Sequence, residues 1–142
     1  MASDLPQQVK AFYERVSLER DQAMEQLPKL YAPNVRFINP VADKTGLEGF
    51  GEAWKKAFKQ YKRFEFENVV VTGDEANFHL SYTMHIKFGI GPVFTTEMAT
   101  HCQGANGQVV YCRDYFDPLG TLVGPFGLFR WLYQVIFRQL VA

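Results

Sequence analysis

The residue best suited to chemistry in this chain is Asp114, an acid in a segment that otherwise alternates like a half-buried strand. Across residues 109–117, the alternation places Asp114 on the same side as Val110, Cys112 and Phe116. A carboxylate among apolar neighbours is costly unless it is protonated or paired, so it usually has a chemical use or a firm hydrogen bond. The alternative is an acid at the end of an edge strand that reaches water.

A histidine on the preceding strand is the expected partner of this acid. The Asn-Gly pair at 106–107 favours a two-residue hairpin turn, and the register that follows sets Ala99 opposite Asp114 and His101 opposite Cys112. His101 is then a diagonal neighbour of Asp114, with the two backbones about 7–8 Å apart. A carboxylate beside an imidazole is the arrangement that general acid–base catalysis uses. The alternative for His101 is a core histidine bonded to a backbone carbonyl.

The segment before these two strands is expected to complete one wall of a pocket. A turn that pairs Phe88 with Val93 sets Tyr82 and Met84 on the face of Ala99. The predicted substrate contacts on this face are Tyr82, Met84, Ala99, Cys112 and Phe116. The same parity sends a second set to the opposite face, whose apolar character suits a subunit interface and predicts a homodimer: Phe94, Met98, Cys102, Tyr111, Arg113 and Tyr115.

The two cysteines, Cys102 and Cys112, are expected to be free thiols. The predicted register points them to opposite faces of the sheet, where they cannot bond to each other. Free thiols indicate a reducing compartment, and the N-terminal residues 1–4 do not begin a signal peptide, so we expect a cytoplasmic protein. Three histidines without clustered carboxylates give no metal site.

The composition narrows the class of protein. The 142 residues suit one domain, and 15 basic and 15 acidic side chains spread along the chain give no footprint for nucleic acid. The chain has 13 Phe, 7 Tyr and 2 Trp, which suit either a cavity with aromatic walls or a dense core.

The order of elements predicts an α+β fold. Apolar spacing indicates helices over 5–19, 21–31 and 46–61, a short strand over 35–39, and four long strands over 64–72, 77–88, 93–103 and 109–117. Three helices must then cover one face of a curled antiparallel sheet, and the space between the layers is the natural ligand pocket.

Residues 119–142 form an apolar extension to the domain at 1–118. They hold only two charged side chains, and from Phe129 they indicate a helix whose polar stripe is Arg130, Gln134 and Arg138. The break at Gly124-Pro125 and the two charges argue against a membrane span. The helix is expected to pack on its own domain or on a second subunit; the alternative is peripheral membrane contact through its apolar face.

Two motifs carry a resemblance to a known superfamily. Residues 30–41 (LYAPNVRFINPV) and the string RDYFD at 113–117 resemble the nuclear transport factor 2-like superfamily, from about residue 5 to 118. Within it, the chain is similar to SnoaL-like polyketide cyclases, ketosteroid isomerases and limonene epoxide hydrolases. The resemblance implies a cone-shaped antiparallel sheet wrapped around the N-terminal helices, and a hydrophobic polyketide-, steroid- or terpenoid-like ligand with no cofactor.

The resemblance also carries residue roles. The RDYFD string implies that Asp114 is the base of an epoxide hydrolase, with Asn39 holding water and Phe37 in place of a tyrosine. The Arg-x-Asp pair of those hydrolases is missing from residues 82–85. Asn39 also stands where the isomerases have their aspartate base, and Ala99 lies near the position of their oxyanion-hole acid.

The polyketide cyclases fit better, because they place an Asp on the last strand and a His on the strand before it. This favours an enzyme, a cyclase, isomerase or hydrolase, in which Asp114 abstracts a proton and His101 stabilises the oxyanion. Asn39 and Tyr82 would orient the ligand. The alternative is a non-catalytic hydrophobic-ligand-binding or dimeric interaction module of the same fold.

Overall fold

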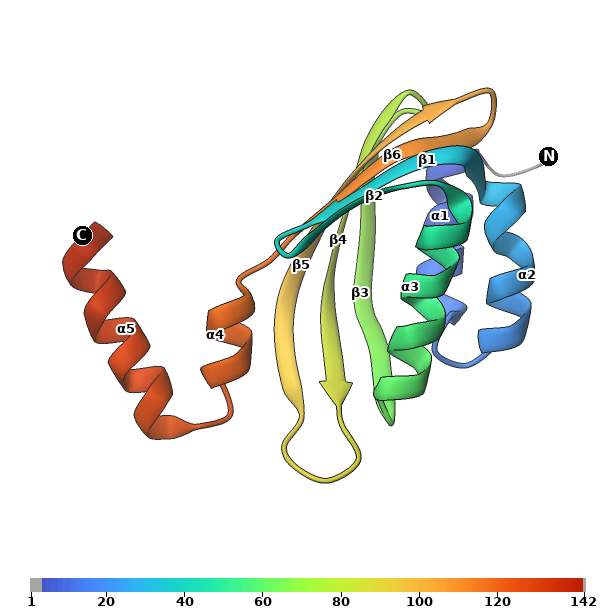
Figure 1. Cartoon of the computed structure of the whole chain (residues 1–142). Helices are drawn as coiled ribbons and strands as arrows, with labels where there is room; N and C mark the ends of the chain where they lie inside the picture. The colour runs from blue at the N-terminus through green and yellow to red at the C-terminus, as the bar shows by residue number, and fades with distance from the viewer. Residues whose placement is uncertain (1–3, 142) are drawn as a thin grey trace.

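A computed structural model describes residues 4–141, so most of the stretch 1–4, where no signal peptide is expected to begin, lies outside the described residues. The fold is α+β, as the sequence predicts, with three helices on one side of a curved sheet and a helical tail beyond the β5 side (Figure 1). The elements are α1 (Leu5–Arg15), α2 (Arg20–Leu30), β1 (Tyr31–Asn39), β2 (Ala42–Thr45), α3 (Leu47–Gln60), β3 (Arg63–Gly73), β4 (Asn77–Lys87), β5 (Phe94–Ala105), β6 (Gln108–Tyr115), α4 (Pro118–Val123) and α5 (Gly127–Val141).

The sheet is mixed rather than purely antiparallel. Within the described residues its order is β2-β1-β6-β5-β4-β3, and β1 runs parallel to β6 while the other neighbours are antiparallel. The predicted antiparallel sheet is wrong at this one pair. The parallel pairing joins the first strand of the chain to the last, which brings residues 37 and 39 beside the strand of Asp114.

The helix α1 shows how the concave face of the sheet is covered. Asp4 caps its first turn by accepting a hydrogen bond from the amide of Gln7 at 3.0 Å, and Pro6 fits the first turn because no intrahelical donor is needed there. Val9 and Tyr13, one turn apart, are both buried. Tyr13 is thereby directed from α1 into the layer between helices and sheet.

The strand β1 begins earlier than the sequence predicted, and β2 was not predicted at all. Pro33 interrupts the strand pattern and lies between Tyr31 and Arg36, where the register between β1 and β6 shifts. The pairing of β1 with β2 begins only at Arg36, so Pro33 has no partner on that side. The short β2 pairs with β1 and is joined to it by the ion pair between Arg36 and Asp43 at 2.8 Å. This edge pair closes one side of the cavity described below.

The β5–β6 hairpin has the predicted turn but not the predicted register. Ala105 pairs with Gln108 as expected, but a bulge after Gln103 shifts every later pair by one residue. Gly104 at this bulge lies against the turn after β3, and a Cβ there would meet the carbonyl oxygen of Glu75 at 2.1 Å. Beyond the bulge Thr100 lies opposite Asp114.

The β4–β5 register is also one residue from the prediction. Ile86, rather than Phe88, pairs near the turn, and its partner is Phe94. The loop between the strands is therefore wider than a four-residue turn, and the parity of β5 relative to β4 is reversed. Met98 and Phe94 point toward the concave side and are buried.

The predicted apolar outer face is consequently wrong. The residues of β5 that lie beside Arg113 and Tyr115 on the convex face are Thr95, Glu97, Ala99 and His101. This face is largely polar, so it gives no reason for a homodimer through the sheet.

The tail consists of two helices, α4 and α5, where one was predicted from Phe129. The side chain of Asp117 caps α4 by accepting from the amide of Gly120 at 2.8 Å, and it also accepts a hydrogen bond from the hydroxyl of Tyr133 in α5. No residue of either helix is buried within the described chain. None of the helices in residues 4–141 has the length and apolar character needed to span a membrane.

Candidate functional site

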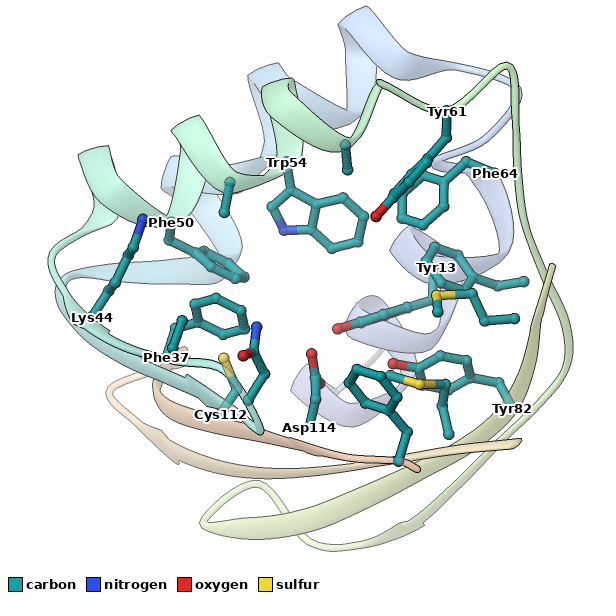
Figure 2. A pocket seen from close by; sticks show the side chains of 18 residues that line it. Tyr13, Phe37, Lys44, Phe50, Trp54, Tyr61, Phe64, Tyr82, Cys112 and Asp114 are labelled. Atoms are coloured by element: carbon teal, nitrogen blue, oxygen red, sulfur yellow. The ribbon is translucent and has the colours of Figure 1, made fainter. Parts of the chain in front are cut away.

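A cavity of about 230 Å³ lies between the helices and the concave face of the sheet (Figure 2). This volume is somewhat below the ~300–1,000 Å³ of typical small-molecule pockets. Most of its wall is aromatic or aliphatic, and its lining residues are Tyr13, Phe37, Asn39, Ala42, Lys44, Phe50, Ala53, Trp54, Ala57, Tyr61, Phe64, Phe66, Tyr82, Met84, Met98, Cys112, Asp114 and Phe116. The cavity therefore suits an apolar small molecule with few polar groups.

Asp114 is the carboxylate of this cavity, and its side chain points into the cavity (Figure 2). Burial among apolar neighbours raises its pKa from 3.8 to about 6, because the charged form loses solvation. A hydrogen bond from the hydroxyl of Thr100, at 2.7 Å, acts in the opposite direction and stabilises the charged form. Asp114 is thus a base whose pKa lies near neutral pH.

A chain of hydroxyl groups stands behind this carboxylate. Thr100 is fully buried and donates its single hydroxyl proton in a hydrogen bond to Asp114. At the 2.8 Å contact between the hydroxyls of Thr100 and Tyr82, the tyrosine must therefore be the donor. Burial raises the pKa of Tyr82 well above its usual value, which keeps this hydroxyl protonated. Tyr82 and Thr100 together fix the orientation of the carboxylate.

Tyr13 brings a second hydroxyl to the cavity. Its ring packs on that of Tyr82 with centroids 5.1 Å apart, and its hydroxyl, which points toward Asp114 (Figure 2), donates a hydrogen bond to the hydroxyl of Tyr82. Burial, followed by the nearby groups that include Asp114, raises the pKa of Tyr13 well above 10, so it stays a hydrogen-bond donor. A donor beside a base is what stabilises negative charge that develops when a proton is removed.

Asn39 and Lys44 supply the remaining polar groups from the β1–β2 edge. The side-chain oxygen of Asn39 accepts a hydrogen bond from the amide of Val41 at 2.9 Å, which fixes the turn between the strands. Its amide nitrogen remains a donor for the cavity. Lys44 lines the same cavity from β2 and is the cation among the lining residues.

The structure brings together most of the residues that the sequence pointed to. Asp114, Asn39, Phe37, Tyr82, Met84, Cys112 and Phe116 all line the cavity. Ala99 and His101 do not, because the register shift turns them to the convex face. The expected contact between His101 and Asp114 is wrong.

On the convex face, His101 has partners of its own. Its Nε2 forms a hydrogen bond with the side-chain oxygen of Asn77, and its ring stacks on His79 with centroids 4.4 Å apart. Partial burial and then the neighbouring His79 lower the pKa of His101. This histidine pair is separated from the cavity by the sheet.

The two cysteines are free, but the predicted placement of their thiols is wrong. Cys102 and Cys112 lie directly opposite each other on the same face, not on opposite faces. Both are buried, and burial raises the pKa of both thiols, so the reactive thiolate is disfavoured. Within residues 4–141, no three His, Cys, Asp or Glu side chains converge as metal ligands.

The residues of the site that sequence reasoning missed include Tyr13, Thr100 and Lys44. Thr100 was detectable as a polar residue between Met98 and Cys102 in an apolar alternation, had the register been right. Tyr13 read as one more apolar position on a helix face, and nothing in the sequence distinguishes its role from that of Phe12. Lys44 belongs to the strand that was not predicted.

The geometry and the sequence agree on a family. The SnoaL-like domain matches residues 9–112, and the chain belongs to the SnoaL-like domain family. No curated protein matches the chain.

Solved structures show the same fold. A candidate polyketide cyclase from Pseudomonas putida is 17% identical with a TM-score of 0.72, covering 87% of this chain and 98% of that one. A candidate SnoaL-like polyketide cyclase from a Jannaschia species is 20% identical with a TM-score of 0.67, covering 87% and 94%. A protein from Catenulispora acidiphila with a ketosteroid isomerase-like fold, in complex with trimethylamine, is 16% identical with a TM-score of 0.71, covering 83% and 91%.

Proposed function

We propose that this protein is a small-molecule cyclase or isomerase that acts on a hydrophobic carbonyl compound by acid–base catalysis. The observation that carries the proposal is Asp114, a carboxylate with a pKa of about 6 inside an apolar cavity. A general base works best when its pKa lies near the operating pH. The similarity to candidate polyketide cyclases and to a ketosteroid isomerase-like fold supports the same class.

In this proposal, Asp114 removes a proton from a carbon next to a substrate carbonyl. The electrons of the broken C–H bond move to the carbonyl oxygen, and the hydroxyl of Tyr13 turns from Tyr82 to donate a hydrogen bond to the resulting oxyanion. The enolate then either takes the proton back from Asp114 at a different carbon, which is an isomerisation, or attacks a second carbonyl of the same molecule. In the second case a C–C bond forms and the new alkoxide takes the proton, which is a cyclisation.

Thr100 acts as a positioning residue in this chemistry. The carboxylate oxygen that accepts from Thr100 is held at 2.7 Å, which leaves the other oxygen for the substrate proton. Because Thr100 in turn accepts from Tyr82, its hydroxyl cannot rotate away without losing both bonds. The base is therefore held in one orientation before the substrate arrives.

A non-catalytic binding module is the second candidate. Two observations favour it: His101 does not line the cavity, and Asn39 has an amide where the isomerases carry an acid. Asp114 is then the one carboxyl group among the lining residues, without a histidine or a second acid beside it. The epoxide hydrolases that the chain resembles use a second carboxylic acid to protonate the opening ring, and the lining of this cavity holds one carboxyl group, that of Asp114.

The two candidates are separated by proton exchange on a probe ketone. We would incubate the protein with 2-tetralone in D₂O and follow loss of the proton signals next to the carbonyl by NMR. We expect exchange above the buffer rate for the natural protein and a loss of about 10²–10⁴-fold in Asp114→Asn, with binding of the ketone changed only a few-fold. Binding of the ketone without accelerated exchange by the natural protein would contradict the enzyme and favour the binding module.

A further inference from the structure

The helix α5 leaves a broad apolar surface without a partner in its own chain. Most of its apolar side chains are exposed to between 40% and 83%, among them Leu128, Phe129, Trp131, Ile136, Phe137 and Leu140. Monomeric proteins rarely expose contiguous apolar patches beyond a few hundred Å², so a surface of this kind marks an interaction site.

The charge of the tail restricts what can cover that surface. From residue 118 to 141 the chain carries two cations, Arg130 and Arg138, and no Asp or Glu. The two arginines and Gln134 are spaced four residues apart, so they form one stripe along α5. Both arginines are exposed, and neither makes an ion pair with any residue from 4 to 141.

The two helices of the tail are held in a defined arrangement. Tyr133 of α5 donates to Asp117, the residue that caps α4, so the helices are joined at that point. Phe126 between them packs edge-on against Phe94 at the start of β5, with centroids 6.3 Å apart. Figure 1 shows α5 lying beyond α4 and away from the sheet. The apolar surface is therefore presented outward by fixed contacts.

We propose that α5 is an interfacial helix that docks on an anionic lipid surface. Its exposed apolar side chains, including Trp131 and Ile136, would lie at the boundary between headgroups and acyl chains, and Arg130 and Arg138 would reach the lipid phosphates. Arg130 and Arg138 lie within the apolar run of α5, which is typical of a helix in the plane of a lipid surface rather than one that crosses it.

Charge complementarity favours lipid over the tail of a second copy of the chain. A second tail would bring the same two cations and no carboxylate to receive them, whereas an anionic bilayer supplies a phosphate for each. Each arginine near such a surface adds about 1 kcal/mol of attraction. The tail also follows Phe116 of the cavity wall almost directly, so docking would hold the cavity close to a source of apolar molecules.

The test is flotation of the full-length chain with vesicles of phosphatidylcholine and phosphatidylglycerol (3:1), or of phosphatidylcholine alone, in 0.1 M salt. We expect co-flotation with the anionic vesicles and at least about tenfold weaker binding to the neutral ones. Arg130→Gln with Arg138→Gln should weaken anionic binding at least about tenfold, and Trp131→Ser with Ile136→Ser should abolish it.

Matched controls separate these effects from general charge and surface changes. Lys56→Gln with Lys59→Gln removes two exposed cations from α3, and Ile90→Ser removes an apolar side chain that is 100% exposed in a loop. Both should bind anionic vesicles as the natural chain does. All of these side chains are exposed or outside the core, so circular dichroism should be unchanged in every variant.

Two results would overturn the proposal. One is the absence of flotation combined with a dimer that Trp131→Ser with Ile136→Ser converts to a monomer, measured by light scattering; a second copy would then cover α5. The other is equal binding to neutral and anionic vesicles, or binding that the two arginine substitutions leave unchanged.

Discussion

The two faces of strand β5 each carry a polar cluster, and the two clusters differ in their exposure to solvent. On the concave face, Thr100 is fully buried and its hydroxyl bonds Asp114 inside an apolar cavity. On the convex face, His101 stacks on His79 and bonds Asn77, with solvent nearby. Desolvation moves the pKa of Asp114 to about 6, whereas it only lowers that of His101, which is already near neutrality when free. The face that excludes water is the one that converts an ordinary acid into a base for neutral pH.

The largest expected difference between the two faces is in the free energy of unfolding: Asp114→Asn should stabilise the protein in a pH-dependent way. The folded pKa of about 6 lies above the ordinary 3.8, so between these values the folded protein keeps a proton that the unfolded chain has released. Stability therefore falls as the pH rises from about 4 to 6 and stays lower above it, by about 3 kcal/mol if the whole shift is realised. The neutral amide avoids this cost, so denaturant unfolding should show the variant close to the natural protein at pH 4 and up to about 3 kcal/mol more stable at pH 8.

Glu97→Gln supplies the control from the convex face of the same strand. It removes the same charge from an exposed position, where the effect on unfolding should be less than about 1 kcal/mol at both pH values. A pH-dependent gain of equal size in the two variants would mean that the two faces do not differ in solvation as described.

A smaller effect is expected from Thr100→Val, which keeps the shape of the side chain and removes the hydroxyl. Without the donor at 2.7 Å the charged form of Asp114 loses this stabilisation. The pKa of Asp114 should therefore be about 1 to 2 pH units higher in the variant than in the natural protein. The pH at which ketone exchange reaches half its maximum should rise by the same amount. Thr100→Ser keeps the hydroxyl and should restore the natural midpoint; failure of the serine variant to do so would assign Thr100 to packing alone.

The smallest effect is expected from His101→Gln. Because the histidine lies across the sheet from the cavity, exchange of the probe ketone and its pH profile should stay within about twofold of the natural protein. A loss comparable to that of Asp114→Asn would restore the histidine–aspartate pair and contradict the register of β5.

The sequence predicted the elements well and their relative register poorly, for physical reasons that particular residues show. Alternation in residues 112–116 was enough to place Asp114, Cys112 and Phe116 in the cavity, because parity within an uninterrupted stretch of strand is a local property. At the bulge the alternation fails, because Val109 is fully buried where Val110 was predicted to share the face of Asp114. Parity between strands depends on a single inserted residue. The bulge beside Gly104 is set by contact with the turn at Glu75, about thirty positions away, and that contact is invisible in the hairpin sequence.

The cavity edge was beyond sequence reasoning for a similar reason. The strand β2 has only four residues, Ala42–Thr45, and three of them are exposed, so it carries no apolar alternation. Its pairing with β1 brings Lys44 to the cavity. Tyr13 could be assigned to the buried face of α1, but the direction of its hydroxyl depends on the packing of Tyr82 and the sheet beneath.

The most direct test of the central claim is the pKa of Asp114 itself. The protein would be labelled with carbon-13 at the side-chain carboxyl of aspartate, and the signal that is missing in Asp114→Asn would be assigned to Asp114. Its chemical shift would then be followed by NMR from about pH 2 to about pH 9, a range that covers the titration of carboxyl groups. We expect a midpoint of about 6 for Asp114. A midpoint at the ordinary value of 3.8 would show that the carboxylate is solvated, and would contradict its role as a base poised by burial.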